Sequence, residues 1–126
     1  MQFETDEQTL VFNKAWHDLL EEIAFTFQKK PDLQTLLFLI GVQELGQLHR
    51  TFNKEEKQDL MHLAVCKLLS TQGYFKYLGR DEEGWPHYSP TKLLPEDKRG
   101  LVSQEQLLKQ QILLYFGKTS SQVVAN

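Results

Sequence analysis

The residue types that could act in nucleophilic chemistry are one thiol and one imidazole on the same predicted helix. Cys66 is the only cysteine of the chain, and His62 precedes it by four residues, so the two side chains share one helix face. A thiol nucleophile needs such a base, and also surroundings that lower its pKa. Neither residue lies near the N-terminus of its predicted helix. The sequence therefore favours a cysteine without a catalytic role.

A second possible chemistry is a carboxylate-bridged metal site inside a helical bundle. Such sites combine glutamates with a carboxylate–histidine pair spaced by three residues. The nearest match is Asp59 with His62, which Glu44 and either Glu21 or His17 would complete. However, most of these side chains lie on the outer faces of their predicted helices and would diverge. We therefore expect no metal and no other cofactor.

Two residues of the second predicted helix favour a ligand site more strongly. Glu44 has mainly apolar neighbours on the helix surface. Its carboxylate is therefore paired with a cation, or has a pKa raised by desolvation, or reaches water at the end of the buried segment. The sequence leaves these alternatives open. Gly41 costs about 1 kcal/mol relative to alanine inside a helix, which indicates close approach by another helix or by a ligand.

The other half of the predicted site is an aromatic arm in the non-helical segment 74–101. Ordered loops that carry aromatic residues and histidine are common at binding surfaces. Alternatively, Trp85 and Tyr88 fold back and cover one open side of the helices. If the arm meets the second helix, the ligand-binding residues are Gly41, Glu44, Trp85, His87 and Tyr88.

Four helices are predicted to position these residues. The hydrophobic periodicity indicates helices over about residues 5–29, 33–48, 53–73 and 103–116. Their predicted start signals are capping boxes at Thr5/Gln8, Asn53/Glu56 and Ser103/Gln106, an Asp32 cap, and a Val102–Leu107 hydrophobic staple. The fold class is therefore mainly all-α, with about four helices and a small β-hairpin or irregular aromatic arm between the third and fourth.

The second helix is predicted to be the central one. Its seven consecutive apolar residues, 36–42, project in all directions around the axis, so the helix must be enclosed on nearly all sides. A buried strand is the alternative. The leucine-rich composition and the absence of a turn signal after residue 42 favour the helix.

The third helix is predicted to have one inner and one outer face. The inner face consists of Leu60, Met61, Ala64, Val65, Leu68 and Leu69, and the outward groups are Glu55, Asp59, His62 and Cys66. The hairpin is predicted from strand-like residues 74–78, a turn over 81–84 and a return strand over 85–88.

The length and charge of the chain limit the classes of function. We expect a single helical domain over 1–117 and a flexible C-terminal tail over 118–126. The net charge of −3 removes the argument for nucleic-acid binding that a strongly basic domain would provide. The longest apolar stretch is about a third of the roughly 20 residues that a membrane-spanning helix needs. The single cysteine and the expected lack of a signal peptide predict a cytoplasmic, intracellular protein.

The leading functional hypothesis is a non-catalytic protein-interaction or accessory module, with a protein partner or self-association, including a homodimer. One alternative is a ligand-binding protein or metal-dependent enzyme with a pocket near Glu44 and the Trp85–Tyr88 arm. Another is a winged-helix-like DNA-binding domain, which the acidic charge of the third helix and of the hairpin tip disfavours. We expect neither a nucleic-acid nor a membrane partner.

Overall fold

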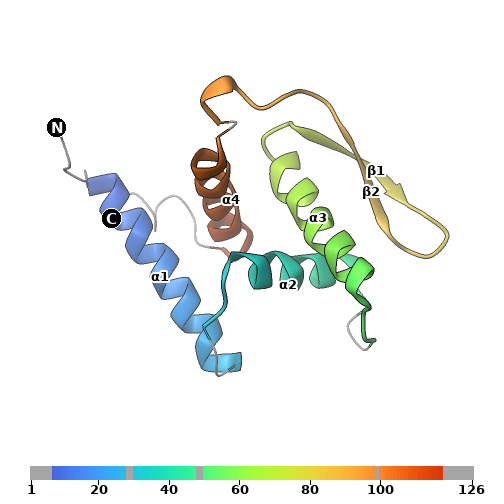
Figure 1. The fold of residues 1–126 in the computed structure, drawn as a ribbon, viewed down its shortest axis with the longest axis horizontal. Helices are drawn as coiled ribbons and strands as arrows, with labels where there is room; N and C mark the ends of the chain where they lie inside the picture. The colour runs from blue at the N-terminus through green and yellow to red at the C-terminus, as the bar shows by residue number, and fades with distance from the viewer. Residues whose placement is uncertain (1–6, 28–29, 48–49, 99, 118–126) are drawn as a thin grey trace. The chain divides into compact units, whose positions relative to one another are not determined.

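The computed structural model describes residues 7–27, 30–47, 50–98 and 100–117. It contains four helices and one β-hairpin (Figure 1), which confirms the predicted mainly helical fold class. The predicted Thr5 cap and the predicted C-terminal tail lie outside the described residues. The elements are α1 (Glu7–Phe27), α2 (Leu33–Leu45), α3 (Lys54–Ser70), β1 (Phe75–Arg80), β2 (Pro86–Pro90), a 3₁₀ turn (Glu96–Lys98) and α4 (Leu101–Tyr115).

The chain divides into two compact units, of which one comprises Met1–Pro31 with Lys109–Asn126, and the other Asp32–Leu108. In the first unit, α1 has one buried apolar face, which consists of Phe12, Trp16, Leu19 and Leu20. Lys109 Nζ lies 5.3 Å from the centroid of the Trp16 ring. The second unit contains α2, α3 and the hairpin, and it holds all the predicted site residues.

Helix α2 begins where the sequence predicts and ends three residues early. The Asp32 carboxylate accepts a hydrogen bond from Thr35 N at 2.8 Å, as expected of a cap. Gly46 follows the helix with a φ of 82°, and its N–H donates to Val42 O. Because this left-handed conformation stops the helix, the predicted end at residue 48 is wrong.

The apolar segment 36–42 is helical, and none of its residues is exposed, so the helix prediction is confirmed against the strand. Gly41 lies directly against the backbone of α3. A Cβ atom at this position would be 2.1 Å from Leu60 O and 2.6 Å from Leu60 C. Close approach by another helix therefore accounts for this glycine, and α2 and α3 pack together across it.

Helix α3 begins with the predicted capping box. Asn53 Oδ1 accepts from Glu56 N at 2.8 Å, and Glu56 Oε1 accepts from Asn53 N at 3.0 Å. The helix ends at Ser70, with Thr71 as its C-cap, so it stops three residues before the predicted end at Gly73. Gly73 instead belongs to the turn that leads into β1.

The predicted faces of α3 need one correction. Leu60, Ala64, Leu68 and Leu69 are buried as predicted, and Glu55, Asp59 and His62 are exposed as predicted. Cys66 is only 4% exposed, so its predicted outward position is wrong. The reason is the hairpin, which lies along this side of α3, with Trp85 and Tyr88 packed against a cluster that includes Leu63.

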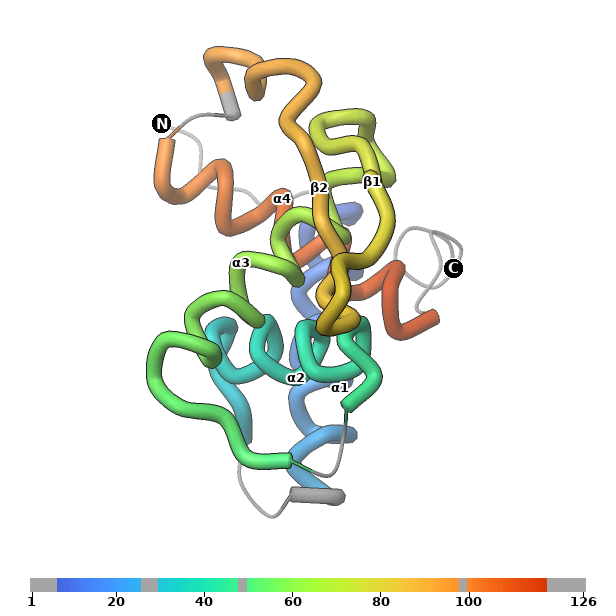
Figure 2. Tube along the Cα trace, turned by 90° about the vertical axis from the view of Figure 1, so that its right-hand side faces the viewer, coloured from blue at the N-terminus to red at the C-terminus, as the bar shows by residue number. Residues whose placement is uncertain are grey.

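The predicted β-hairpin is present. Strands β1 and β2 pair antiparallel, with Phe75 opposite Pro90 and Arg80 opposite Pro86, and the register shifts between Tyr77 and Gly79. In Figure 2 the hairpin runs along α3 toward the end of α2, where hydrogen bonds from Arg80 join them. The hairpin therefore carries its turn residues to a fixed place in the second unit.

Helix α4 begins two residues before the predicted start. Gln104 N donates to Gly100 O at 2.9 Å, so the first helical turn begins before Ser103 and includes it. Leu101 and Val102 are 86% and 74% exposed. Ser103 is therefore not the N-cap, and the predicted staple is wrong because Val102 already lies inside the helix. Among the helices of the described ranges, none combines the length and apolarity needed to cross a membrane.

Candidate functional site

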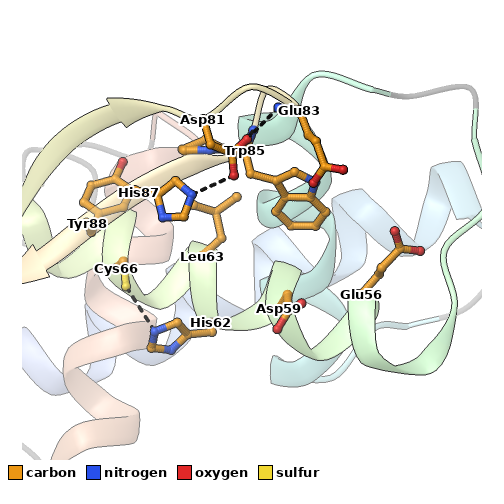
Figure 3. Close-up of a pocket in the computed structure, with 11 residues that line it drawn as sticks. Glu56, Asp59, His62, Leu63, Cys66, Asp81, Glu83, Trp85, His87 and Tyr88 are labelled. Atoms are coloured by element: carbon orange, nitrogen blue, oxygen red, sulfur yellow. Dashed lines mark hydrogen bonds and ion pairs between the residues drawn. The ribbon is translucent and has the colours of Figure 1, made fainter.

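A cavity of about 530 Å³ lies between α3 and the hairpin, entirely within the second unit (Figure 3). Helix α3 forms one wall, and the turn of the hairpin with the start of β2 forms the other. The lining residues are Glu56, Asp59, His62, Leu63, Cys66, Asp81, Glu83, Trp85, Pro86, His87 and Tyr88. Four of them are carboxylates and none is lysine or arginine, so the cavity is strongly biased toward cations.

The hairpin wall is fastened to the end of α2 by one arginine. Arg80 Nη2 donates to Glu44 O at 2.8 Å, and Arg80 Nη1 donates to Leu45 O at 3.1 Å and to Gly84 O at 2.6 Å. Gln47 Nε2 adds a bond to Glu83 O at 3.1 Å. A guanidinium suits this position because the last carbonyls of a helix lack partners and carry partial negative charge.

Asp81 organises the turn itself. Its Oδ1 accepts from Glu83 N at 2.9 Å and from Trp85 N at 3.0 Å, and its Oδ2 lies 2.8 Å from His87 Nε2 (Figure 3). These contacts favour the ionised carboxylate and hold the pKa of Asp81 below its ordinary value, chiefly through His87 and next through Trp85. One carboxylate therefore holds both the backbone at Trp85 and the imidazole of His87.

Acid is expected to weaken the turn for this reason. A carboxyl whose pKa is lowered by folding contributes stability that is complete above its unfolded pKa and is lost as the pH falls through the folded pKa. The Asp81→Asn variant keeps Oδ1 but cannot ionise. We expect the stability advantage of the wild type over this variant to shrink as the pH falls below about 4. Denaturant unfolding of both proteins at several pH values measures it, and an advantage that does not change with pH contradicts the prediction.

The α3 wall presents two carboxylates in different states. Glu56 belongs to the capping box and pairs with Arg50, so the bond from Asn53 N and then the Arg50 guanidinium lower its pKa. Asp59 is exposed, and no described residue pairs with its carboxylate. Glu83 on the opposite wall is also exposed, and its carboxylate has no pairing partner within the described part of the chain. The cavity thus has one uncompensated carboxylate on each wall.

The Cys66–His62 pair also lines the cavity. Cys66 Sγ lies 3.5 Å from His62 Nε2, so the spacing in the sequence does bring the two groups together. Burial nevertheless raises the pKa of the Cys66 thiol. A buried thiol with a raised pKa stays protonated near neutral pH, and the protonated thiol is a poor nucleophile.

The aromatic residues form the floor between the two walls. Trp85 and Tyr88 pack against a core cluster of Leu45, Leu60 and Leu63. Burial raises the pKa of Tyr88, and the nearby Glu44 carboxylate adds to the increase. Both rings therefore lie partly in the core and partly in the cavity. The arm covers the helices and also lines the cavity, so each of the two arrangements considered from the sequence describes part of it.

The structure brings together only part of the site predicted from the sequence. Trp85, His87 and Tyr88 line the cavity, whereas Gly41 and Glu44 do not. Gly41 is covered by the backbone of Leu60. The Glu44 side chain is 23% exposed, and its Oε1 lies 4.0 Å from Lys67 Nζ, so the paired alternative describes it.

The contribution of α3 to the cavity was not predicted from the sequence. Four of the lining residues, Glu56, Asp59, Leu63 and Cys66, follow one another at intervals of three or four, which places them along one helix face. This spacing was a usable signal for a shared surface. Within residues 7–27, 30–47, 50–98 and 100–117, no group of three or more His, Cys, Asp or Glu residues could hold a metal ion.

The fold and the site together define a mainly helical protein with a carboxylate-rich aromatic cavity between a helix and a hairpin. Comparisons with protein-family models, with curated proteins and with solved structures found no match.

Proposed function

We propose that this protein is a non-catalytic protein-interaction module that binds its partner in the cavity between α3 and the hairpin. The observation that carries the proposal is the combination of a 530 Å³ cavity, an indole and two uncompensated carboxylates. Binding sites for small ligands typically occupy about 300–1,000 Å³ and combine an apolar surface with a few polar groups. Trp and Tyr are also the residues most enriched at the energetic centres of protein interfaces.

The groups that could act in catalysis support a binding role. His87 is engaged by Asp81, which belongs to the turn, and the Cys66 thiol is kept protonated by burial. General acid–base or nucleophilic catalysis needs a group that is both reactive and directed at a substrate. In this cavity His87 is held by the turn, and the Cys66 thiol lacks the lowered pKa of an activated nucleophile.

The charge of the cavity favours a protein partner over a nucleic acid. Nucleic-acid binding is dominated by cationic contacts with phosphates. The walls here carry Glu56, Asp59, Asp81 and Glu83 without a lysine or arginine. The single cysteine supports a reducing, cytoplasmic location. Self-association through the same cavity is the second possible mode of interaction, and light scattering at increasing protein concentration distinguishes it.

Selection from a random peptide-display library tests the proposal. The wild type is the bait, and the double variant Asp59→Lys/Glu83→Lys is the matched counter-bait. Both side chains are exposed, so the variant should fold, which circular dichroism checks. We expect enriched peptides that bind the wild type and lose at least about tenfold in affinity for the variant. Peptides that bind both proteins equally, or no enrichment at all, would show that the cavity is not the recognition site.

A further inference from the structure

We propose that the cavity binds an arginine side chain from a basic, extended segment of a partner protein. This inference rests on the proposed function and names the chemistry of the partner. It follows from the positions of the two uncompensated carboxylates, from the indole between them, and from an arginine of the chain itself that makes the same kind of contact.

The electrostatics of the cavity favour a cation from outside. Of the four lining carboxylates, Glu56 is paired with Arg50 and Asp81 with His87. Asp59 on α3 and Glu83 on the hairpin turn have no side-chain partner among the described residues. In Figure 3 these two carboxylates belong to different walls, and the Trp85 indole lies between the walls. A cation placed over the indole would therefore have a carboxylate on either side.

The shape of this site favours a guanidinium over an ammonium. A guanidinium is planar, stacks on an aromatic ring, and directs its N–H donors outward in its own plane. Trp85 is backed by the core residues Leu45, Leu60 and Leu63, which hold the ring in place. Stacking on a fixed indole leaves the N–H groups free to donate to carboxylates at the edges. A lysine ammonium is a compact point charge and makes only part of this arrangement.

The chain already contains an example of this contact at the edge of the cavity. Arg50 lies with its Cζ 4.6 Å from the centroid of the Phe52 ring, and its Nη2 pairs with the cavity residue Glu56. Arg50 thus combines an aromatic face with a carboxylate, as we infer for the bound arginine. Because Arg50 is committed to Glu56, it does not neutralise Asp59 or Glu83.

The size of the cavity indicates a peptide segment as the source of the arginine. A volume of about 530 Å³ exceeds what one guanidinium fills. Pro86 and Tyr88 extend the lining beyond Trp85 along β2 and offer apolar contact to the residues that flank the arginine. An arginine within an extended segment would therefore bind more tightly than the free amino acid.

Indole N–H signals in two-dimensional NMR provide the test. The chain has two tryptophans, and Trp16 belongs to the other compact unit, so it serves as an internal reference. The probes are three heptapeptides with arginine, lysine or citrulline at the centre and the same alanine and serine residues on both sides, together with free argininamide. We expect the arginine peptide to shift the Trp85 signal saturably, with binding about five- to tenfold weaker for lysine and more than tenfold weaker for citrulline, which is neutral. Argininamide should bind more weakly than the arginine peptide.

Single substitutions locate the contact. Glu83→Gln and Asp59→Asn keep the shape of each side chain and remove its charge, so each should weaken arginine binding about three- to tenfold. The matched control is Glu55→Gln, an exposed α3 residue that does not line the cavity and should leave binding unchanged. Equal binding of the arginine and citrulline peptides, or no saturable Trp85 shift at about 10 mM peptide, would overturn the inference.

The display selection separates the two possible failures. If the selected peptides depend on Asp59 and Glu83 but are not enriched in arginine, the proposed interaction module is supported and the proposed binding of arginine is contradicted. Equal binding of argininamide and the arginine peptide would assign the site to a small cationic molecule and reject the peptide segment. Peptides that are insensitive to both carboxylates would reject the module and the inference together.

Discussion

Replacement of Gly41 by alanine is expected to destabilise the protein by about 3 kcal/mol, because the new methyl group would overlap the backbone of α3. The added Cβ would be 2.1 Å from Leu60 O and 2.9 Å from Leu60 Cβ. A backbone carbonyl cannot rotate away as a flexible side chain can, so α2 and α3 must separate. The gain of about 1 kcal/mol from the higher helix propensity of alanine is included in this net figure.

The matched control for this substitution is Gly100→Ala. Apart from its two chain neighbours, no described residue has an atom within 4 Å of a Cβ placed at Gly100, so this variant should differ from the wild type by less than about 1 kcal/mol. Urea denaturation followed by circular dichroism gives the free energy of unfolding for all three proteins. A Gly41→Ala protein as stable as the wild type would mean that the close helix contact does not govern stability.

Local signals in the sequence predicted most of the fold. The Asp32 cap and the Asn53/Glu56 capping box lie where they were predicted, because such caps depend only on residues within one helical turn. The hairpin was likewise predictable from strand-like residues on both sides of the Asp81–Gly84 turn. The start of α4 was not predicted correctly, because serine is a residue type typical of helix N-caps. The helix already begins at Leu101, two residues before Ser103.

The cavity was only half predictable, because it depends on which elements pack together. Trp85, His87 and Tyr88 could be identified from their types alone. The register between the hairpin and α3 has no local signal in the sequence, so the positions of the hairpin over Cys66 and opposite Asp59 could not be predicted. Glu44 was expected in the site because it lies on the apolar central helix. Instead, the Glu44 carboxylate lies beside Lys67, close to the end of α2 at Gly46, and outside the cavity.

Loss of the Arg80 side chain is expected to release the hairpin from the end of α2. Its guanidinium donates to the carbonyls of Glu44, Leu45 and Gly84, and alanine would leave all three without this donor. Hydrogen bonds from a charged group contribute about 1.5–3 kcal/mol each when they are buried, and solvent reduces that value here. We therefore expect Arg80→Ala to lower the free energy of unfolding by about 2 kcal/mol in total. The displaced turn should also make Trp85 more accessible to solvent.

Two further variants distinguish the hydrogen bonds of Arg80 from its charge. Arg80→Lys keeps the charge but cannot bridge three carbonyls, so its stability should lie between those of the wild type and Arg80→Ala. Lys76→Ala removes an exposed cation from the same strand and should change stability by less than about 0.5 kcal/mol. Tryptophan fluorescence quenching by acrylamide, with unfolding measured in parallel, reports both effects. If Lys76→Ala and Arg80→Ala cost the same, net charge rather than the three carbonyl contacts would account for the loss.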